Sequence, residues 1–177
     1  MGRLQACLTL RRAVLRLSMH HTPAALIFRL SVLQPSHALG MMPKEGHNAV
    51  FYPDVLPLLR RAMDALVPVY IVSAEQSARE IMALLEHSYH GDIRALVRGA
   101  GQGDVLGYAE AVYASLAKEK RFIAVFSDAA ADVTACDAVG FAAELVVRPG
   151  AAATMPEFIR DFRDVLQPHR HGAGCCG

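Results

Sequence analysis

From about residue 50 onward, short apolar runs alternate with stretches in which apolar residues recur at helical spacing. Four runs have the length of buried strands, at 67–72, 93–97, 122–126 and 141–147, and the second is the least regular. Residues three and four apart predict helices at 54–66, 76–87, 104–116, 129–139 and 156–166. This alternation predicts an α/β fold, a Rossmann-like three-layer structure with a parallel sheet between helices.

Polar residues and glycines mark the ends of several of these elements. Asp54 and Asp104 stand where helices begin, and their side-chain oxygens can cap those helices. Gly140 follows the helix at 129–139 and is suited to a left-handed stop. The stretch Gly99–Gly103 matches neither of the glycine patterns of nucleotide-binding loops, so we interpret it as a turn.

The first 43 residues differ from the rest of the chain in charge. They hold five arginines and no acid, whereas residues 44–177 hold 13 basic and 17 acidic residues. This composition fits a mitochondrial transit peptide, a mis-predicted gene start or a genuine structural segment, and the sequence leaves all three open. The acidic body gives no reason to expect nucleic acid, and no apolar run approaches the roughly 20 residues that span a membrane.

We expect three regions along the chain: a basic N-terminal segment at 1–45, a core at 46–167 and a flexible tail at 168–177. The cysteines form no disulfide framework. Cys136 lies on a predicted helix face and is interpreted as a buried small hydrophobe. The spacing of Cys175 and Cys176 matches no zinc pattern. We expect a reducing, cytoplasmic location, with a mitochondrial one as the alternative because of the arginine-rich N-terminus.

Candidate chemistry lies where strands end, because the carboxyl ends of parallel strands form the ligand-binding edge of such sheets. Ser73 can contact a phosphate oxygen or cap a helix. The carboxylate of Asp128 can bind Mg²⁺ together with phosphate oxygens, or cap a helix. Asp132 follows one turn later and either supports such a metal site or is a solvated helix residue. The scattered histidines give no support to a hydrolase triad.

Several segments resemble, in their order, the carboxyl-terminal core of the enolase-phosphatase family, also called acireductone synthase. This family is a branch of the haloacid dehalogenase-like superfamily and acts in methionine salvage. The resemblance covers about residues 46–150. The segments that carry it are Phe51–Leu56, Val69–Ser73, Glu86–Asp92, Gly107–Ala111, Phe126–Asp132 and Leu145–Gly150.

The resemblance implies a Mg²⁺-dependent phosphatase in which an aspartate attacks the phosphorus and an acid two residues later lies near the metal. The family's small phosphorylated substrate is 2,3-diketo-5-methylthiopentyl-1-phosphate, which is enolised and then dephosphorylated. Carried onto this sequence, the resemblance assigns Ser73, Ala74 and Gln102 to substrate binding. It assigns Asp128 to the metal and Asp132 to the support of the metal site.

The chain departs from the family's pattern where the reaction should start. Its first aspartate is Asp54, which matches a structural position, so residues 1–53 hold no aspartyl nucleophile. The cap domain has no counterpart, and we expect the first catalytic strand to be missing as well. The family's second serine and its glycine are Ala74 and Glu75 here, and its lysine falls on Gln102. The carboxylate of Glu75 would repel phosphate.

Residues 24–31 offer an alternative source for the missing central strand, and they would place Arg29 or Ser31 near the nucleophile position. An arginine cannot attack phosphorus. We therefore expect a truncated or degenerate member of the family, without detectable Mg²⁺-dependent phosphatase activity. Two alternatives stay open. One is an active enzyme with a mis-annotated amino-terminal half. The other is a non-catalytic α/β binding module whose incomplete sheet is covered by a partner chain.

Overall fold

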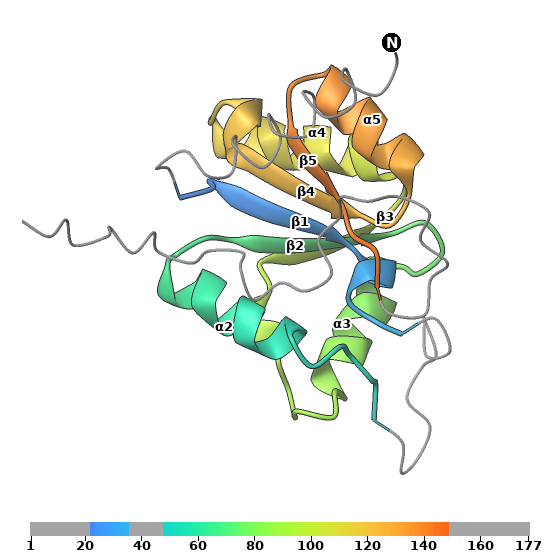
Figure 1. Cartoon of the computed structure of the whole chain (residues 1–177). Coiled ribbons are helices and arrows are strands. Elements are labelled where there is room, and N and C mark those ends of the chain that lie inside the picture. Colours follow the sequence, from blue (N-terminus) through green and yellow to red (C-terminus); the bar gives the residue numbers. More distant parts are fainter. Residues whose placement is uncertain (1–21, 36–47, 149–177) are drawn as a thin grey trace, which may run out of the picture.

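The computed structural model describes residues 22–35 and 48–148, which form a parallel five-stranded sheet between two layers of helices (Figure 1). The strands are β1 (Ala25–Arg29), β2 (Val69–Ser73), β3 (Gly99–Gln102), β4 (Ile123–Ser127) and β5 (Ala142–Leu145). The α-helices are α2 (Val55–Asp64), α3 (Ala78–Glu86), α4 (Val105–Leu116) and α5 (Ala130–Ala138). Short 3₁₀ helices are η1 (Leu30–Val32), η3 (Arg94–Leu96) and η4 (Lys120–Phe122). The α/β prediction is confirmed; the helix predicted at 156–166 and the tail at 168–177 lie outside the described residues.

β1 is the central strand of the sheet, whose spatial order is β3-β2-β1-β4-β5. It pairs in parallel with β2 on one side and with β4 on the other. This corrects the expectation that the first catalytic strand is missing and confirms the alternative that residues 24–31 supply it. The run is apolar on both faces, as the centre of a parallel sheet requires. An incomplete sheet is therefore no longer a reason to expect a partner chain at this place.

Two hydrophobic cores hold β1 from opposite sides. Leu26 and Phe28 join the core under α2 and α3, whereas Ala25 and Ile27 join the core under α4 and α5. The ring of Phe28 stacks on that of Phe126 in β4, with centroids 4.8 Å apart and planes 13° apart. Such a ring pair stabilises the fold by about 0.5–1.5 kcal/mol beyond the area it buries. The position of the last residue of β1 is therefore fixed by both layers.

The edge strand β3 corrects two predictions. The run at 93–97 contains the 3₁₀ helix η3 and no strand, and the glycine stretch that we interpreted as a turn forms β3. A Cβ atom on Gly101 would lie 2.2 Å from Cε2 of Tyr108 in α4. Glycine thus lets the tyrosine ring pack directly on the strand. Because glycine has low strand propensity, the sequence pattern favours a turn at this place.

The predicted helix ends are confirmed at two of three places. Oδ1 of Asp104 accepts a hydrogen bond from the Gly107 N–H at 2.7 Å and so caps α4. Gly140 follows α5 with a φ of +99°. Asp54 precedes α2 but makes no capping bond with its side chain. Its carboxylate instead accepts a hydrogen bond from Nη1 of Arg148 at 2.7 Å, because a buried guanidinium needs a charged partner.

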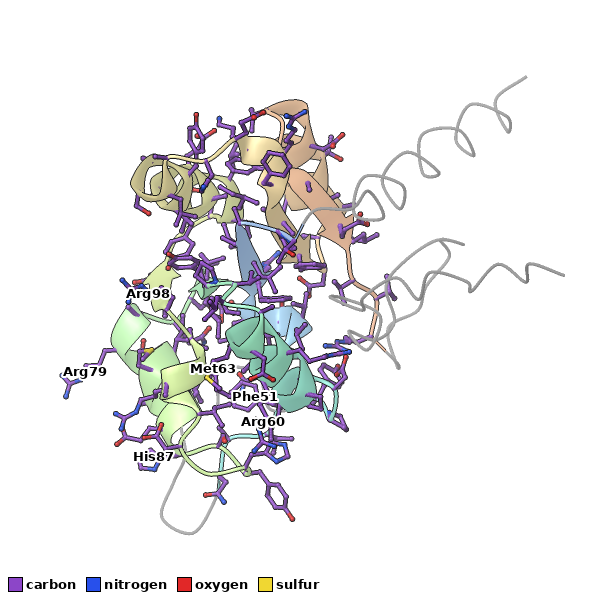
Figure 2. The ribbon with its side chains drawn as sticks, turned by 90° about the vertical axis from the view of Figure 1, so that its left-hand side faces the viewer. Phe51, Arg60, Met63, Arg79, His87 and Arg98 are labelled. Carbon is purple, nitrogen blue, oxygen red and sulfur yellow. The ribbon has the colours of Figure 1, made fainter. Side chains whose placement is uncertain are left out.

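The outer faces of α2 and α3 carry charged side chains. Figure 2 shows Arg60 on α2, and Arg79 extending from α3 away from the rest of the molecule. Leu66, just after α2, is 90% exposed. None of the described helices combines the length and the apolar character that a membrane-crossing helix requires.

Candidate functional site

The carboxyl ends of the strands bring the candidate residues to one edge of the sheet. β1 ends at Arg29, β2 at Ser73, β3 at Gln102 and β4 at Ser127, directly before Asp128. All strands run parallel, so these ends share the edge at which sheets of this kind bind ligands. Because β1 is central, Arg29 stands between the pair of Ser73 and Gln102 on one side and Asp128 on the other.

Arg29 forms ion pairs with both candidate aspartates. Its Nη1 donates a hydrogen bond to Oδ2 of Asp132 at 3.0 Å and lies 3.6 Å from Oδ1 of Asp128. The side chains of Arg29, Asp128 and Asp132 are 30%, 42% and 24% exposed. Solvent screens pairs of this exposure, so each contributes at most about 1 kcal/mol to stability. Two carboxylates therefore share one guanidinium at the end of the central strand.

Two serines complete this network and hold one carboxylate each. Oγ of Ser31, in η1, donates to Oδ1 of Asp128 at 2.7 Å. Oγ of Ser127 donates to Oδ2 of Asp132 at 2.7 Å and accepts a hydrogen bond from the Ala129 N–H at 3.1 Å. Ser127 is fully buried. The aspartates are thus tied both to β1 with its following turn and to the end of β4.

These contacts exclude one of the two interpretations of each aspartate. α5 begins after Ala129 and has no side-chain cap, so Asp128 does not act as a helix cap. Asp132 belongs to the network at the sheet edge and is more than a solvated helix residue. Ser127 is a member of this site that is not predicted from the sequence. The signal was a hydroxyl at the end of a fully apolar run, where a buried polar group needs a partner.

On the other side of β1, the groups expected to bind substrate are engaged within their own loop. Ser73 and Gln102 are register partners in β2 and β3. Oγ of Ser73 donates to Oε1 of Gln76 and accepts the N–H groups of Glu75 and Gln76 at 3.3 and 3.2 Å. Nε2 of Gln102 donates to the carbonyl oxygen of Glu75 at 3.1 Å. Ala74 contributes no polar side-chain group, so the polar side chains of this half of the site are used to hold the loop after β2.

The helix after this loop has its own cap, so Ser73 is not the cap of α3. Oγ of Ser77 accepts a hydrogen bond from the Glu80 N–H, and the Glu80 carboxylate accepts one from the Ser77 N–H. The backbone N–H and the hydroxyl of Ser77 both donate to the Glu80 carboxylate, and these two hydrogen bonds lower the pKa of Glu80. The reciprocal arrangement is a capping box, which satisfies two backbone donors at the start of α3.

The part of the chain that the structure describes offers no cysteine suited to act as a nucleophile. Its only cysteine is Cys136, whose side chain is fully buried in α5. Burial raises the pKa of this thiol to about 11, and the nearby charge of Asp132 adds to the effect. The thiol is therefore protonated at neutral pH, whereas covalent chemistry requires the thiolate.

The side chains at this edge do not fit a divalent metal ion. Mg²⁺ takes oxygen ligands and commonly binds through carboxylates, of which Asp128 is the candidate. The guanidinium of Arg29 lies beside that carboxylate and would meet a metal ion with like charge. Within residues 22–35 and 48–148, no three His, Cys, Asp or Glu side chains form a group that could hold a metal ion.

A buried ion pair anchors the turn that carries Ser31. Nη1 of Arg148 donates to Oδ2 of Asp54 at 2.7 Å, and Nε donates to the carbonyl oxygen of Val32 at 2.8 Å. The guanidinium also lies over the Tyr52 ring, 4.3 Å from its centroid. Asp54 and Arg148 are 9% and 8% exposed. Two of the segments that carry the family resemblance therefore meet in the fold, one through Tyr52 and Asp54 and the other through Arg148.

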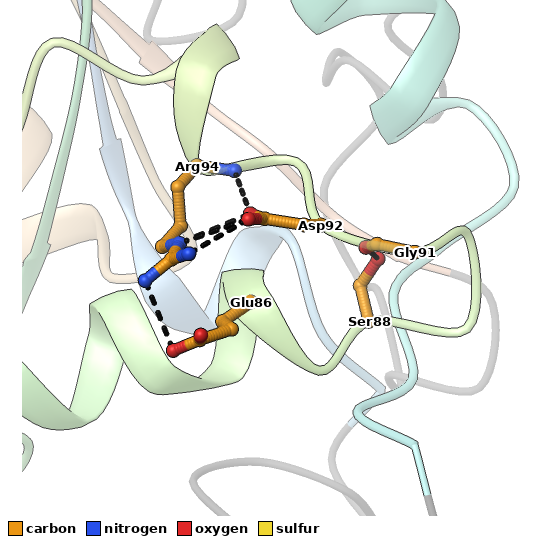
Figure 3. Close-up of polar contacts among 5 residues, drawn as sticks. All are labelled: Glu86, Ser88, Gly91, Asp92 and Arg94. Carbon is orange, nitrogen blue, oxygen red and sulfur yellow. Dashed lines mark hydrogen bonds and ion pairs between the residues drawn. The ribbon is translucent and has the colours of Figure 1, made fainter.

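The segment that follows α3 forms a second polar cluster, drawn in Figure 3. Arg94 pairs with Asp92 at 2.7 Å and with Glu86 at 3.0 Å. The hydrogen bonds from Arg94 lower the pKa of Asp92. Oγ of Ser88 donates to the carbonyl oxygen of Gly91. Because α3 leads back from the carboxyl edge, this cluster lies away from the site and holds the connection to β3.

Comparison with known proteins places this fold. No family model matches the chain. Its sequence is 28% identical over 137 residues to enolase-phosphatase E1 of Caenorhabditis briggsae. The aligned region covers 71% of this chain and 54% of that protein. The solved structure of UTR4 from Saccharomyces cerevisiae matches with a TM-score of 0.55 and 18% identity, over 66% of this chain and 57% of its own.

A second solved structure with a similar fold is that of the 3-deoxy-D-manno-octulosonate 8-phosphate phosphatase of Moraxella catarrhalis, which holds magnesium, phosphate and KDO. It matches with a TM-score of 0.53 and 16% identity, over 79% of this chain and 74% of its own. The expected resemblance is confirmed: the chain is similar in sequence to an enolase-phosphatase and has the fold of the haloacid dehalogenase-like phosphatases. It spans about half the length of the enolase-phosphatase that it matches.

Proposed function

We propose that this chain is a degenerate relative of the enolase-phosphatases whose core does not carry out the covalent phosphatase reaction. One observation carries the proposal: the central strand β1 ends in Arg29, near the position from which the family's aspartate attacks phosphorus. A guanidinium stays protonated in proteins and has no carboxylate oxygen with which to form an acyl phosphate. Arg29 is instead engaged with Asp128 and Asp132.

The charge around this position also opposes a small phosphorylated substrate, including the one that the resemblance implies. Arg29 brings one positive charge to the edge, whereas Asp128, Asp132 and Glu75 bring three negative ones. Gln102 stands where the family has a positively charged lysine. A phosphate dianion would therefore meet net repulsion, which lowers its affinity. The core remains folded around a five-stranded sheet, so the loss of catalysis that we propose leaves the α/β fold intact.

The test is a phosphatase assay of the full chain with Mg²⁺ and a generic aryl phosphate, beside a competent enolase-phosphatase as positive control. We expect phosphate release at the buffer background, and the same rate for Asp128→Ala. Hydrolysis clearly above background that is lost in Asp128→Ala would overturn the proposal, because it would show that the edge still performs phosphatase chemistry.

A further inference from the structure

We infer that the guanidinium of Arg29 takes the place of a divalent cation at the carboxyl edge of the sheet. It holds Asp128 and Asp132 together in a core that needs no metal. A core could lose its nucleophile and still bind Mg²⁺, so this role of Arg29 is separate from the absence of hydrolysis. It rests on the contacts of Arg29 and not on the phosphatase assay.

Two carboxylates from neighbouring elements face the end of β1, and they need a positive charge between them. Asp128 follows β4 directly, and Asp132 lies in the first turn of α5. Like charges at close range destabilise the folded state unless a cation compensates them. Nη1 of Arg29 lies 3.0 Å from the nearest oxygen of Asp132 and 3.6 Å from that of Asp128. The chain therefore supplies the compensating charge from its own central strand.

The same contacts oppose a metal ion at this place. Mg²⁺ binds carboxylate oxygens at about 2.1 Å, so it would have to approach Oδ1 or Oδ2 of Asp128 next to the guanidinium. Oδ1 already accepts the hydroxyl of Ser31 at 2.7 Å. To admit the ion without a close like charge, Arg29 would have to move away from Asp128, and its contact with Asp132 would still keep the guanidinium nearby. We therefore expect Mg²⁺ to bind the wild-type protein negligibly at this edge.

A single substitution should allow this edge of the sheet to bind a divalent metal ion. Arg29→Asp removes the cation and adds a third carboxylate from β1 to those of Asp128 and Asp132. Several carboxylates with adjoining water are the oxygen ligands that Mg²⁺ and Mn²⁺ prefer. Arg29→Met removes the cation without adding a ligand, so it separates the loss of the ion pairs from the gain of a donor.

The experiment compares the thermal unfolding of full-length wild type, Arg29→Met, Arg29→Asp and Arg79→Asp, each with and without Mg²⁺ and then Mn²⁺. Arg79→Asp makes the same change of charge on the exposed face of α3 and serves as the matched control (Figure 2). We expect both Arg29 variants to melt below wild type without metal. We expect added metal to raise the Tm of Arg29→Asp by several degrees, and to leave wild type and Arg79→Asp unchanged.

The rise in Arg29→Asp should disappear when Asp128→Asn is added, since Asp128 would be a ligand. Two results would overturn the inference. The first is a metal-induced rise in the Tm of wild type that Asp128→Asn removes. The second is an Arg29→Met variant as stable without metal as wild type. If Arg29→Asp does not fold, the wild-type and Arg29→Met measurements still decide. Metal binding by wild type without hydrolysis would leave the proposed function standing.

Discussion

Nη1 of Arg29 lies 3.0 Å from Oδ2 of Asp132, although 103 positions separate the two residues in the sequence. The contact joins the end of the central strand to the first turn of α5. It places a fixed cation at the edge where the resemblance to enolase-phosphatases implies a nucleophile and a metal ion. The proposed loss of phosphatase chemistry and the altered charge of this edge thus both involve Arg29.

The pairing of Arg29 with Asp132 predicts a measurable coupling energy. We expect Arg29→Met and Asp132→Asn to lower the free energy of unfolding, and the double variant to lose less than the sum of the single losses. The expected coupling is about 0.5–1 kcal/mol and should shrink as salt is raised, because both side chains are partly exposed. Urea unfolding of the four proteins at low and high salt measures it. Strictly additive losses would show that the ion pair contributes nothing.

The buried pair of Arg148 and Asp54 should be far more sensitive to substitution. Arg148→Met leaves the Asp54 carboxylate buried without its charged partner, and we expect it to lower the free energy of unfolding by about 3–5 kcal/mol. Adding Asp54→Leu removes the stranded charge and should restore much of this loss. Urea unfolding of the single and double variants checks the prediction. A double variant no more stable than Arg148→Met would contradict this explanation.

Packing of the Tyr108 ring on β3 predicts that Gly101 tolerates no side chain. Gly101→Ala should lower the free energy of unfolding by about 1–3 kcal/mol, because its Cβ would overlap the ring. Gly99→Ala is the matched control and should lower the free energy of unfolding less. Its Cβ would lie 3.2 Å from the Tyr70 ring, so that ring would have to move less. In a Tyr108→Ala background the cost of Gly101→Ala should disappear. An equal cost in both backgrounds would show that the loss comes from the backbone of β3 and not from the Tyr108 ring.

Glu144 predicts a dependence of stability on pH. Burial raises its pKa from the ordinary 4.5 to about 7, and the charge of Asp137 adds to this. The folded state thus holds the proton more tightly than the unfolded state. The stability this gives is fully present below about pH 4.5 and is lost as the pH rises through about 7.

Glu144→Gln should therefore be more stable than wild type at about pH 8, by an amount on the order of 1–3 kcal/mol, and similar to it at about pH 4.5. Chemical unfolding at both pH values measures the difference. Glu119→Gln makes the same substitution at a side chain that is 64% exposed and controls for the general effect of removing one carboxyl group. A constant difference between Glu144→Gln and wild type across the range would rule out titration of this carboxyl as the cause.

The strands that the sequence predicts correctly, β2, β4 and β5, are those whose burial produces an apolar run. β1 is predicted only as an alternative, because Arg29 interrupts its run. β3 is not predicted because its glycines form no apolar run. Glycine is needed there because the Tyr108 ring of α4 packs on the strand, and that contact cannot be derived from the local sequence. The sequence also predicts the wrong contact for Asp54, because its side chain is expected to cap α2 and instead pairs with Arg148. A helix start is visible in the local sequence, whereas Arg148 lies 94 positions away.

The candidate site is predictable in its positions but not in its contacts. Asp128 and Ser73 follow recognisable strands, so the shared edge can be derived from the parallel sheet. The ion pairs of Arg29 and the hydrogen bond from Ser127 depend on how β1, β4 and α5 pack. A charge at the end of a buried run indicates that some partner exists, but only the assembled sheet edge identifies Asp132.

The most direct measurement is a crystal structure of the full chain grown in the presence of Mn²⁺, with data collected for the anomalous signal of manganese. We predict electron density for the Arg29 guanidinium beside Asp132 and Asp128, and no anomalous peak at the carboxylate of Asp128. An anomalous peak on that carboxylate, with the side chain of Arg29 turned away from both aspartates, would contradict the central claim that the arginine stands in place of the metal.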